Sequence, residues 1–461
     1  MVLELQAEIK KLRQDHAAEI ADLKAQLKLY SGNSSQPPSS DPPSAPKPPP
    51  KKSPTGRKPG GQPGHTGHLR ERLPVERVSE TIQYIPDQCG HCGAALSKAC
   101  GQNEAEPTWH QVIELPDQPL IVTEHQGHGR TCACCGHLTR GKIPAEILAH
   151  RFGPNLTSGI VFLSGRCHDS KRVVVEIVQT IFGVPISLGT ICNLEAEAAL
   201  ALAPAHAQAE ALVRTAAVKN VDETGWYERS KLKWLWAAGT KTVAFFKILA
   251  GRGKAQFKEL LGEKITGIIC SDRWSAYNLV KLIYRQLCWS HLKRDFQKWL
   301  DRGGDGVAIG QAGLSVVKRL FEQWRLFKEG KISRPALAAA MKPLRRELRQ
   351  ALQAGLECAD KKVKRFCKSI LKVYSALWTF VRVENVEPTN NHAERIIRLA
   401  VLWRKVSFGN HSVGGCLFAE RILTVVQTLT LQKRNALPYL RTVMQSSRLG
   451  QKIPSLLLAG V

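Results

Sequence analysis

The spacing of apolar residues changes several times along the chain, and each change predicts a different kind of element. Near the N-terminus, apolar positions recur every three or four residues from Leu5 to Tyr30, with charged residues between them. This spacing predicts a short coiled coil over residues 1–30. Two successive steps of four residues around His16 shift the apolar seam and weaken its register. An amphipathic helix that packs against its own chain has the same pattern.

Residues 31–75 contain few apolar side chains and many Pro, Gly, Ser and Lys residues. This composition predicts a disordered basic linker, because the segment has almost nothing to bury in a core. Its cations, such as Lys51 and Arg57, would neutralise phosphates without reading a base sequence. A flexible tether that carries charge for solubility explains the composition nearly as well.

Between residues 76 and 150 the pattern changes to short stretches broken by Gly and Pro. The stretches at 80–86 and 120–125 alternate apolar and polar residues, as half-buried strands do. We therefore expect a small β-rich module over 76–150.

Two CxxC pairs bracket the predicted strands of this module. Four thiolates are enough for a tetrahedral Zn²⁺ ion, and such a site is structural because no ligand position stays open for a substrate. Reduced cysteines without a metal are the alternative. The four predicted ligands are Cys89, Cys92, Cys132 and Cys135, and His91, Cys134 and His137 are spare donors.

Residues 151–210 have the apolar spacing of helices. One predicted helix ends at Gly183, and Ser187 is placed to cap the next one. Helix, glycine turn and helix is the outline of a helix-turn-helix that reads DNA. A plain helical hairpin has the same outline, so both interpretations stay open.

The pattern of residues from 211 to the end of the chain predicts an α/β region that is interrupted by helices. Four stretches rich in β-branched and aromatic residues predict strands, with a helix between the third and the fourth. The strands are expected at 216–222, 233–240, 242–249 and 266–272, and the helix at 253–261. We predict an α/β core over 211–300 and 386–430, a helical insertion over 301–385 and a C-terminal tail over 431–461.

Three acidic residues are the candidate catalytic groups of this core. Asp222 ends the first predicted strand and Asp272 ends the fourth, so neighbouring strands can aim both carboxylates at one point. Each aspartate alone is also explained as a turn former or helix cap. Glu394 is the third acid, and it fits equally well as the third helical residue of a capping box that begins at Asn391. Three carboxylates suit Mg²⁺ or Mn²⁺, and two such ions promote in-line displacement at phosphorus.

The charge of the chain points to a polyanionic partner. The 461 residues have a formal net charge of +27, which favours nucleic acid over an anionic membrane. Four basic residues follow Glu394 on the same predicted helix and are expected to hold DNA phosphates, although exposed helix charges are usually only solvated. They are Arg395, Arg398, Arg404 and Lys405.

Cys288 and His291 form a CxxH pair at the start of another predicted helix. Two ligands are half of a metal site. His291 is otherwise explained as a group that orients a phosphate or a carboxylate, or as a buried histidine.

Cysteine usage and hydropathy bear on the compartment. The thirteen cysteines do not form a secreted disulfide framework, and no stretch reaches about 18 uninterrupted apolar residues. The N-terminus also lacks the pattern of a signal peptide. We expect a protein of the cytoplasm that has no membrane anchor.

Together these motifs resemble those of the insertion sequence 66 family of bacterial DDE transposases. The resemblance rests on NSSQPPSSD and GGQPGHTG in the linker, the CxxC pairs, VDETGW at 221–226, SDRWSAYN at 271–278, CWSHLKRDF at 288–296, TNNHAERIIR at 389–398 and RKVSFG at 404–409. It implies a ribonuclease H-like core with a helical insertion and a catalytic triad of Asp222, Asp272 and Glu394. It also implies that Cys288 and His291 are auxiliary residues.

The same resemblance implies hydrolysis at the ends of a mobile element and attack of the freed 3′ hydroxyls on target DNA. The expected cofactors are two Mg²⁺ or Mn²⁺ ions per active site and a structural Zn²⁺. The expected partners are double-stranded DNA, further copies of the chain joined through the coiled coil, and companion proteins of the element. A nuclease or resolvase of the same fold, and a catalytically silent zinc-bearing DNA-binding regulator, are the alternatives.

Overall fold

The computed structural model describes residues 72–84, 86–89, 91–96, 109–116, 119–135 and 137–457, together with isolated positions between 6 and 33. The chain divides into two compact units. One unit comprises Met1–Ala45 and His125–Val461, and the other comprises Pro46–Glu124.

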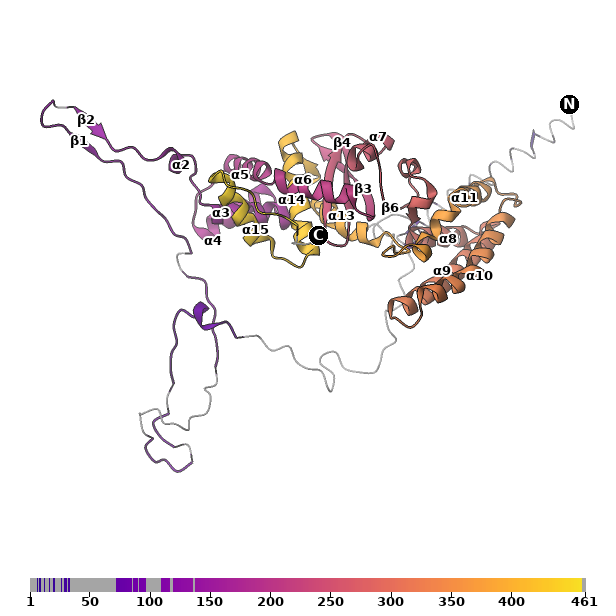
Figure 1. Cartoon of the computed structure of the whole chain (residues 1–461), viewed down its shortest axis with the longest axis horizontal. Coiled ribbons are helices and arrows are strands. Elements are labelled where there is room, and N and C mark those ends of the chain that lie inside the picture. Colours follow the sequence, from indigo (N-terminus) through magenta and orange to yellow (C-terminus); the bar gives the residue numbers. More distant parts are fainter. Residues whose placement is uncertain are drawn as a thin grey trace. The chain divides into compact units, whose positions relative to one another are not determined.

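A mixed sheet forms the centre of the larger unit (Figure 1). Its strand order is β5-β4-β3-β6-β7, and β8 pairs with the far end of β3. The first three strands are antiparallel, whereas β6 and β7 run parallel to β3. The strands are β3 (Val218–Glu228), β4 (Lys231–Gly239), β5 (Ala244–Leu249), β6 (Ile268–Ser271), β7 (Arg285–Leu287) and β8 (Gly409–Asn410).

The four predicted strands and the helix between the third and the fourth are confirmed as β3 to β6 and α7 (Lys254–Leu261). The three-residue strand β7 was missed, because so short a stretch has no measurable alternation. Strand β3 is longer than predicted, since its hairpin with β4 continues to Glu228.

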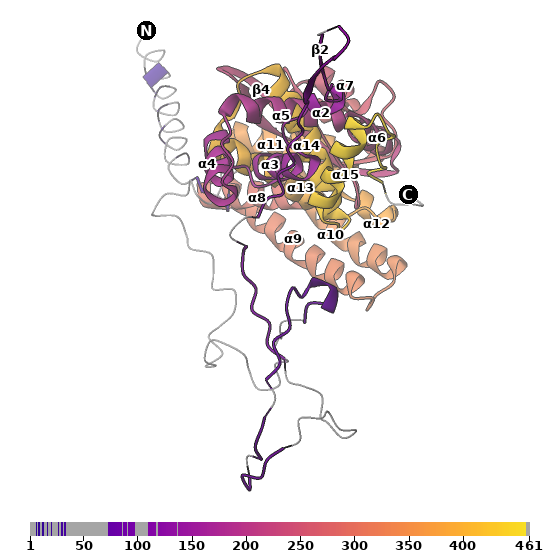
Figure 2. The same ribbon diagram turned by 90° about the vertical axis from the view of Figure 1, so that its left-hand side faces the viewer.

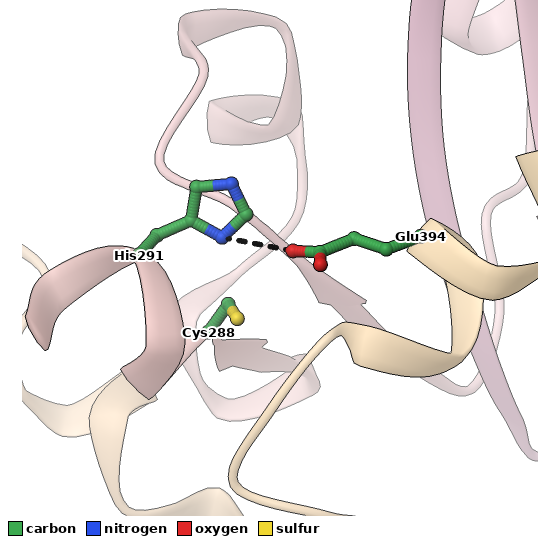
Figure 3. A group of neighbouring side chains, drawn as sticks. All are labelled: Cys288, His291 and Glu394. Carbon is green, nitrogen blue, oxygen red and sulfur yellow. Dashed lines mark ion pairs between the residues drawn. The ribbon is translucent and has the colours of Figure 1, made fainter. Parts of the chain in front are cut away.

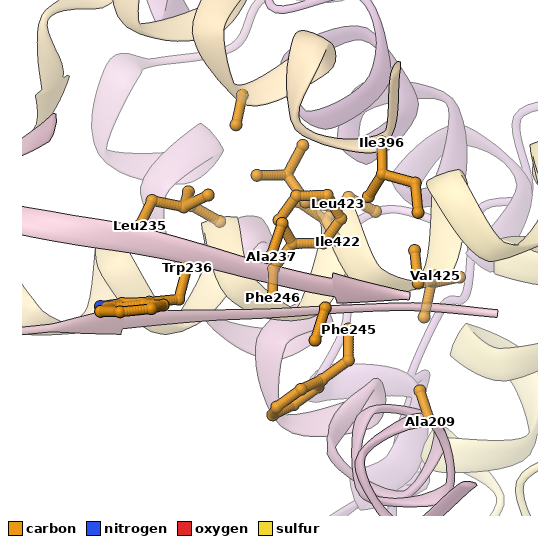
Figure 4. Close-up of a cluster of buried hydrophobic side chains, with 14 of the residues drawn as sticks. Ala209, Leu235, Trp236, Ala237, Phe245, Phe246, Ile396, Ile422, Leu423 and Val425 are labelled. Atoms are coloured by element: carbon orange, nitrogen blue, oxygen red, sulfur yellow. The ribbon is translucent and has the colours of Figure 1, made fainter. Parts of the chain in front are cut away.

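Helices cover both faces of the sheet. Figure 4 shows Ile396 of α13 and Leu423 of α14 on one side of β4 and β5, and Ala209 of α6 on the other side. On the α6 side, the Trp236 ring stacks on Phe257 of α7 with ring centroids 6.2 Å apart. The bounds are α6 (Ala203–Thr215), α13 (Asn391–Ser407) and α14 (Val413–Leu431). The sheet is therefore the middle layer of a three-layer α/β fold.

The segment predicted as a helical insertion is made of helices, and it contributes to a second hydrophobic core. Trp289, Phe296 and Leu320 are buried there, together with Ile268 and Leu287 from the adjoining end of the sheet. Helices α9 and α10 lie side by side in both views (Figures 1 and 2). The insertion follows α8 (Trp289–Arg302) and contains α9 (Gly306–Lys328), α10 (Arg334–Ala354), α11 (Lys361–Lys372), η5 (Tyr374–Leu377) and α12 (Thr379–Arg382).

The predicted helix, glycine turn and helix is present ahead of the sheet. Gly183 adopts a left-handed φ of 66° at the end of the first helix, and the Ser187 hydroxyl accepts the Thr190 N–H at 3.2 Å, as predicted for a cap. Val174, Val178 and Ile191 form a small separate core between the helices. The helices are α3 (Pro154–Arg166), α4 (Lys171–Phe182) and α5 (Leu188–Ala201).

The segment predicted as a C-terminal tail contains helix α15 (Ala436–Arg448). Tyr439, Leu440 and Val443 of this helix are buried in the main core, and α15 packs against α3. The predicted core ended at residue 430. Apolar residues at helical spacing in 436–448 are a signal in the sequence that indicates this further helix.

The segment with the two CxxC pairs contains less sheet than predicted. Neither 80–84 nor 120–125 forms a strand, and Ile82, Tyr84, Ile121 and Val122 are largely exposed. Their alternation failed as a signal because no second apolar layer covers either stretch. Among the described residues, regular pairing here is confined to the hairpin of β1 (Gly129–Thr131) with β2 (Leu138–Arg140) and to an isolated bridge between Gln88 and Ala95.

The predicted coiled coil and basic linker lie almost entirely outside the described residues. Of residues 1–30, the described positions Ile9, Leu12 and Ile20 are helical and about half exposed. Self-association through this segment therefore stays a prediction.

Candidate active site

Asp222 and Asp272 occupy matching positions on neighbouring parallel strands. The ladder between β3 and β6 ends at the pair Asn220 and Cys270, and each aspartate comes two residues later. Because parallel strands advance in register, the two carboxylates reach the same end of the ladder. Asp272 directly follows β6, as predicted, whereas Asp222 lies inside β3 and pairs with Ala237 of β4.

The two aspartates are in an electrostatically unfavourable environment. Burial raises the pKa of Asp222 well above its ordinary value, and the charges of Glu223, Asp272 and Glu394 raise it further. Burial also raises the pKa of Asp272, against the pull of hydrogen bonding and nearby arginines. Buried carboxylates that repel one another are relieved when cations bind between them.

Glu394 is held near the aspartates through the residue at the start of α13. The Asn390 side chain donates to the Val221 carbonyl oxygen at 2.8 Å and accepts from the Asn220 amide at 2.9 Å. Asn390, not Asn391, is the N-cap residue, and no side chain makes a capping hydrogen bond. The capping-box explanation of Glu394 is therefore wrong. Sequence reasoning missed Asn390 because its contacts lie on distant strands.

Cys288 and His291 lie beside Glu394, and Figure 3 shows the imidazole and the carboxylate pointing toward one another. The His291 Nδ1 and Glu394 Oε1 atoms are 3.6 Å apart. One donor atom from each of the three residues lies within 4.8 Å of the other two. Among the described residues this is the single group of that kind, so Asp222, Asp272 and Glu394 do not form one.

A buried network supports the loop that follows β6. Glu223, on the opposite face of β3 from Asp222, accepts hydrogen bonds from the Tyr277 hydroxyl and from Arg252 Nε, the latter at 2.6 Å. The Arg252 guanidinium stacks on the Trp274 ring at 3.9 Å, and the Trp274 N–H donates to Asp272 Oδ1 at 2.8 Å. None of the residues in this network apart from Asp272 was predicted from the sequence. Glu223 lies in the motif VDETGW, and Trp274 and Tyr277 lie in SDRWSAYN.

The four basic residues predicted to hold DNA have different environments on α13. Arg395, Arg398 and Lys405 are exposed. Glu394, Arg398 and Lys405 follow one another at spacings of four and seven, which places them along one stripe of the helix. Arg404 points elsewhere, because its guanidinium donates to the Thr224 hydroxyl and the Gly225 carbonyl oxygen at 2.9 Å each.

Each CxxC pair forms a tight turn by itself. The Cys89 N–H donates to the Ala94 carbonyl oxygen, and N–H groups of Cys92 and His91 lower the pKa of the Cys89 thiol. The Cys132 turn repeats this pattern, with N–H groups of Cys135 and Cys134 lowering the pKa of the Cys132 thiol. Lowered thiol pKa values favour the thiolate that binds a metal. The two turns belong to different compact units.

None of the helices in the described part of the chain has both the length and the apolar character needed to cross a lipid bilayer.

The structure is a three-layer α/β fold with two aspartates at one end of its β3–β6 ladder, and comparison with known proteins identifies the family. Residues 150–416 match the model of the family described as "Transposase IS66 family". The match covers more than half of the chain, so the protein belongs to this family of transposases. Residues 2–71 match a second model, which is described only as a family of unknown function.

Two curated relatives come from Sinorhizobium fredii (strain NBRC 101917 / NGR234). The uncharacterized protein y4hP is 24% identical over 416 residues, which cover 81% of this chain and 72% of that protein. The uncharacterized protein y4qI is 29% identical over 252 residues, which cover 48% of this chain and 44% of that protein. The chain thus matches less than half the length of y4qI.

Proposed function

We propose that this transposase cuts the ends of an insertion element with Asp222, Asp272 and Glu394 and joins the freed 3′ hydroxyls to target DNA. The observation that carries the proposal is the matched placement of Asp222 and Asp272 at the end of the β3–β6 ladder, within reach of the Glu394 charge. Family membership supports the reaction class.

The order and direction of the strands support a ribonuclease H-like core. Three antiparallel strands followed by two parallel strands on one side, with helices on both faces, is the arrangement expected of that fold. Fold alone does not specify the reaction, so the proposal depends on the acids and not on the sheet.

The donor set of the three acids fits Mg²⁺ or Mn²⁺, because these ions prefer carboxylate oxygens. When bound, two such ions activate the attacking oxygen and stabilise the leaving oxygen of an in-line displacement. In the protein itself, Asp222 and Asp272 supply neighbouring carboxylates, and Asn390 orients the helix that carries Glu394.

The basic residues of α13 support a route for the DNA backbone toward the acids. Arg398 and Lys405 share a helix stripe with Glu394, so phosphates held by these side chains would lie along the helix that carries the third acid. Arg395 adds an adjacent positive charge. We assign Arg404 to the core instead, because both of its hydrogen bonds go to β3.

We further propose that the two CxxC turns share a structural Zn²⁺, that 1–30 joins copies of the chain, and that the helices α4 and α5 contact DNA. The lowered thiol pKa values support the first assignment, and the Ser187 cap and Gly183 turn support the third. We also propose that companion proteins encoded by the same element act together with this transposase.

The test uses Asp272→Asn and Asp222→Asn in the full chain, with element-end DNA as the substrate. Each variant is expected to lose cleavage by at least about a thousandfold, because the acids hold catalytic metal. Binding of the same DNA should fall less than about threefold, because the acids do not hold the duplex. Lys258→Gln, on the far-side helix α7, is the control and should cleave normally.

Cleavage by either aspartate variant at the unmodified rate would contradict the triad, whereas absence of cleavage by the wild-type chain would favour the silent regulator. A strand-transfer assay with pre-cut ends and plasmid distinguishes a transposase from a nuclease or resolvase. A nuclease or resolvase would give hydrolysis products without joined DNA.

A further inference from the structure

We propose that Cys288, His291 and Glu394 bind a thiophilic divalent cation such as Zn²⁺ at a site separate from the magnesium ions. Sulfur, imidazole nitrogen and carboxylate oxygen are the three donor types that zinc accepts, whereas magnesium prefers oxygen alone. The three donors come from two helix starts, α8 and α13, that the fold brings together.

The separation of the donors fits one ion. Tetrahedral zinc with bonds of about 2.0 to 2.3 Å places its donor atoms about 3.3 to 3.6 Å apart. His291 Nδ1 and Glu394 Oε1 are 3.6 Å apart, and the Cys288 sulfur lies within 4.8 Å of both.

Two of the donor atoms lack any other function in the described structure. His291 Nδ1 and Glu394 Oε1 are buried, and neither has a hydrogen-bond partner among the described residues. Their separation of 3.6 Å is longer than a hydrogen bond, so neither atom is committed to the other. A neutral imidazole is the form that binds a metal. Unpartnered buried polar atoms are costly, and a shared cation removes that cost.

The surroundings of Cys288 favour a bound thiolate. Its sulfur accepts the Asn390 N–H at 3.1 Å, and N–H groups of His291 and Ser290 at the start of α8 also point to it. Metal binding at this thiol would release its proton to solvent. Such N–H groups are the usual second shell of a metal-bound cysteine.

A further buried oxygen lies one helical turn before Glu394. Asn391 Oδ1 has no hydrogen-bond partner among the described residues, and its spacing of three places it on the same side of α13. Asn391 is therefore the first candidate for a fourth ligand or for an acceptor from metal-bound water.

The site would also fix Glu394 for the reaction, and this consequence rests on the proposed function. A cation on Oε1 holds the carboxylate by one oxygen and leaves the other for the catalytic metals. Because α8 and α13 flank the helical insertion, the same ion would join its two ends.

The test measures zinc bound to the purified full chain by elemental analysis after dialysis. Wild-type protein is expected to hold about one equivalent more than Cys288→Ser. Cys367→Ser removes an equally buried thiol from the insertion and should keep the wild-type content. Because the CxxC cysteines are unchanged in all three proteins, the difference reports Cys288 alone.

A second measurement tests the site with other variants, so it does not depend on whether Cys288→Ser folds. Titration of the metal-free chain with Co²⁺ should give weaker binding at this site by at least about tenfold in Glu394→Gln and in His291→Ala, with altered visible absorption. Equal zinc content in wild type and Cys288→Ser, or unchanged cobalt spectra in both ligand variants, would overturn the site.

The two proposals fail separately. Loss of one zinc equivalent in Cys288→Ser together with normal cleavage by Asp272→Asn would support the proposed metal site and refute the proposed catalytic triad. Unchanged zinc together with loss of cleavage in Asp272→Asn would do the reverse.

Discussion

Arg398 and Arg404 lie on the same helix, yet their side chains have different roles. Arg398 is exposed to solvent, whereas the Arg404 guanidinium joins α13 to β3 through Thr224 and Gly225. A hydrogen bond from a charged group in a partly buried position contributes about 1.5–3 kcal/mol to stability. An exposed arginine contributes little to folding but can neutralise a phosphate.

Replacement of each arginine by alanine should separate these roles. Arg398→Ala is expected to weaken DNA binding and to reduce the slope of log affinity against log salt concentration by about one, with an unchanged melting temperature. Arg404→Ala is expected to lower the free energy of unfolding by about 1–3 kcal/mol. Denaturant unfolding and salt-dependent DNA titrations measure the two effects. Equal stability of both variants would contradict the assignment of Arg404 to the core.

At the scale of elements, α14 protects the free edge of the sheet. Strand β5 is an edge strand, and its outward N–H groups would otherwise be open to pairing with another chain. The N–H groups of Ala244, Phe246 and Ile248 donate instead to Thr428, Thr424 and Glu420, at 3.0, 3.0 and 2.7 Å. The match is geometric: four helical residues rise about 6 Å, and two strand residues span about 6.6 Å.

Glu420 should make the stability of this edge depend on pH. Burial raises its pKa from 4.5 to about 7. Since the folded pKa is the higher one, the stabilisation by the protonated form is complete below about pH 4.5 and is lost as pH rises through 7. Each tenfold change in proton affinity corresponds to about 1.4 kcal/mol, so the loss is about 3 kcal/mol.

Glu420→Gln keeps an acceptor for the Ile248 N–H and removes the charge. The variant should therefore be more stable than wild type near pH 8 and similar to it near pH 5, as measured by denaturant unfolding. Glu263→Gln, where the carboxylate is 82% exposed, is the control. A constant difference between Glu420→Gln and wild type across this pH range would refute the expectation.

Elements with strong local patterns could be predicted from the sequence, and the assembly of the site could not. The strands β3 to β6 and the Ser187 cap depend on residues within one short segment. The position of Glu394 depends on Asn390, whose hydrogen-bond partners are on strand β3, about 170 residues earlier in the sequence. No local pattern in the sequence indicates such a contact. The three acids could be identified by the resemblance of their motifs to those of a known family, but their positions relative to one another could not be predicted.

The stretches at 80–84 and 120–125 show the opposite error. Their alternation of apolar and polar residues predicted strands, but Ile121 is 98% exposed and Tyr84 is 90% exposed. Alternation predicts a strand only where a neighbouring strand and an apolar layer are present, and both are tertiary features.

At the scale of the whole molecule, the two CxxC pairs lie on segments of the chain other than those that carry the three acids. The CxxC turns lie outside the sheet and its covering helices, whereas the acids are on β3, after β6 and on α13. A structural metal at the turns would therefore support recognition of DNA without contributing to the α/β core.

Combined replacement Cys89→Ser and Cys92→Ser should remove about one equivalent of zinc and strongly reduce binding to element ends. The α/β core should still form, so the near-ultraviolet circular dichroism of its buried tryptophans, such as Trp226 and Trp236, should change little. Wild-type zinc content in this variant would refute the predicted site at the turns. Collapse of the tryptophan signal would contradict the independence of the core.

The distance along the chain between the acids has a consequence for synthesis on the ribosome. Asp222 and Asp272 emerge early, but Glu394 follows the entire helical insertion, and α14, which closes the edge of the sheet, follows Glu394. A nascent chain that stalls between Asp272 and α13 therefore carries two of the three acids and an open edge of the sheet. If the three acids cut DNA as proposed, the order of translation itself keeps such an unfinished chain from cutting.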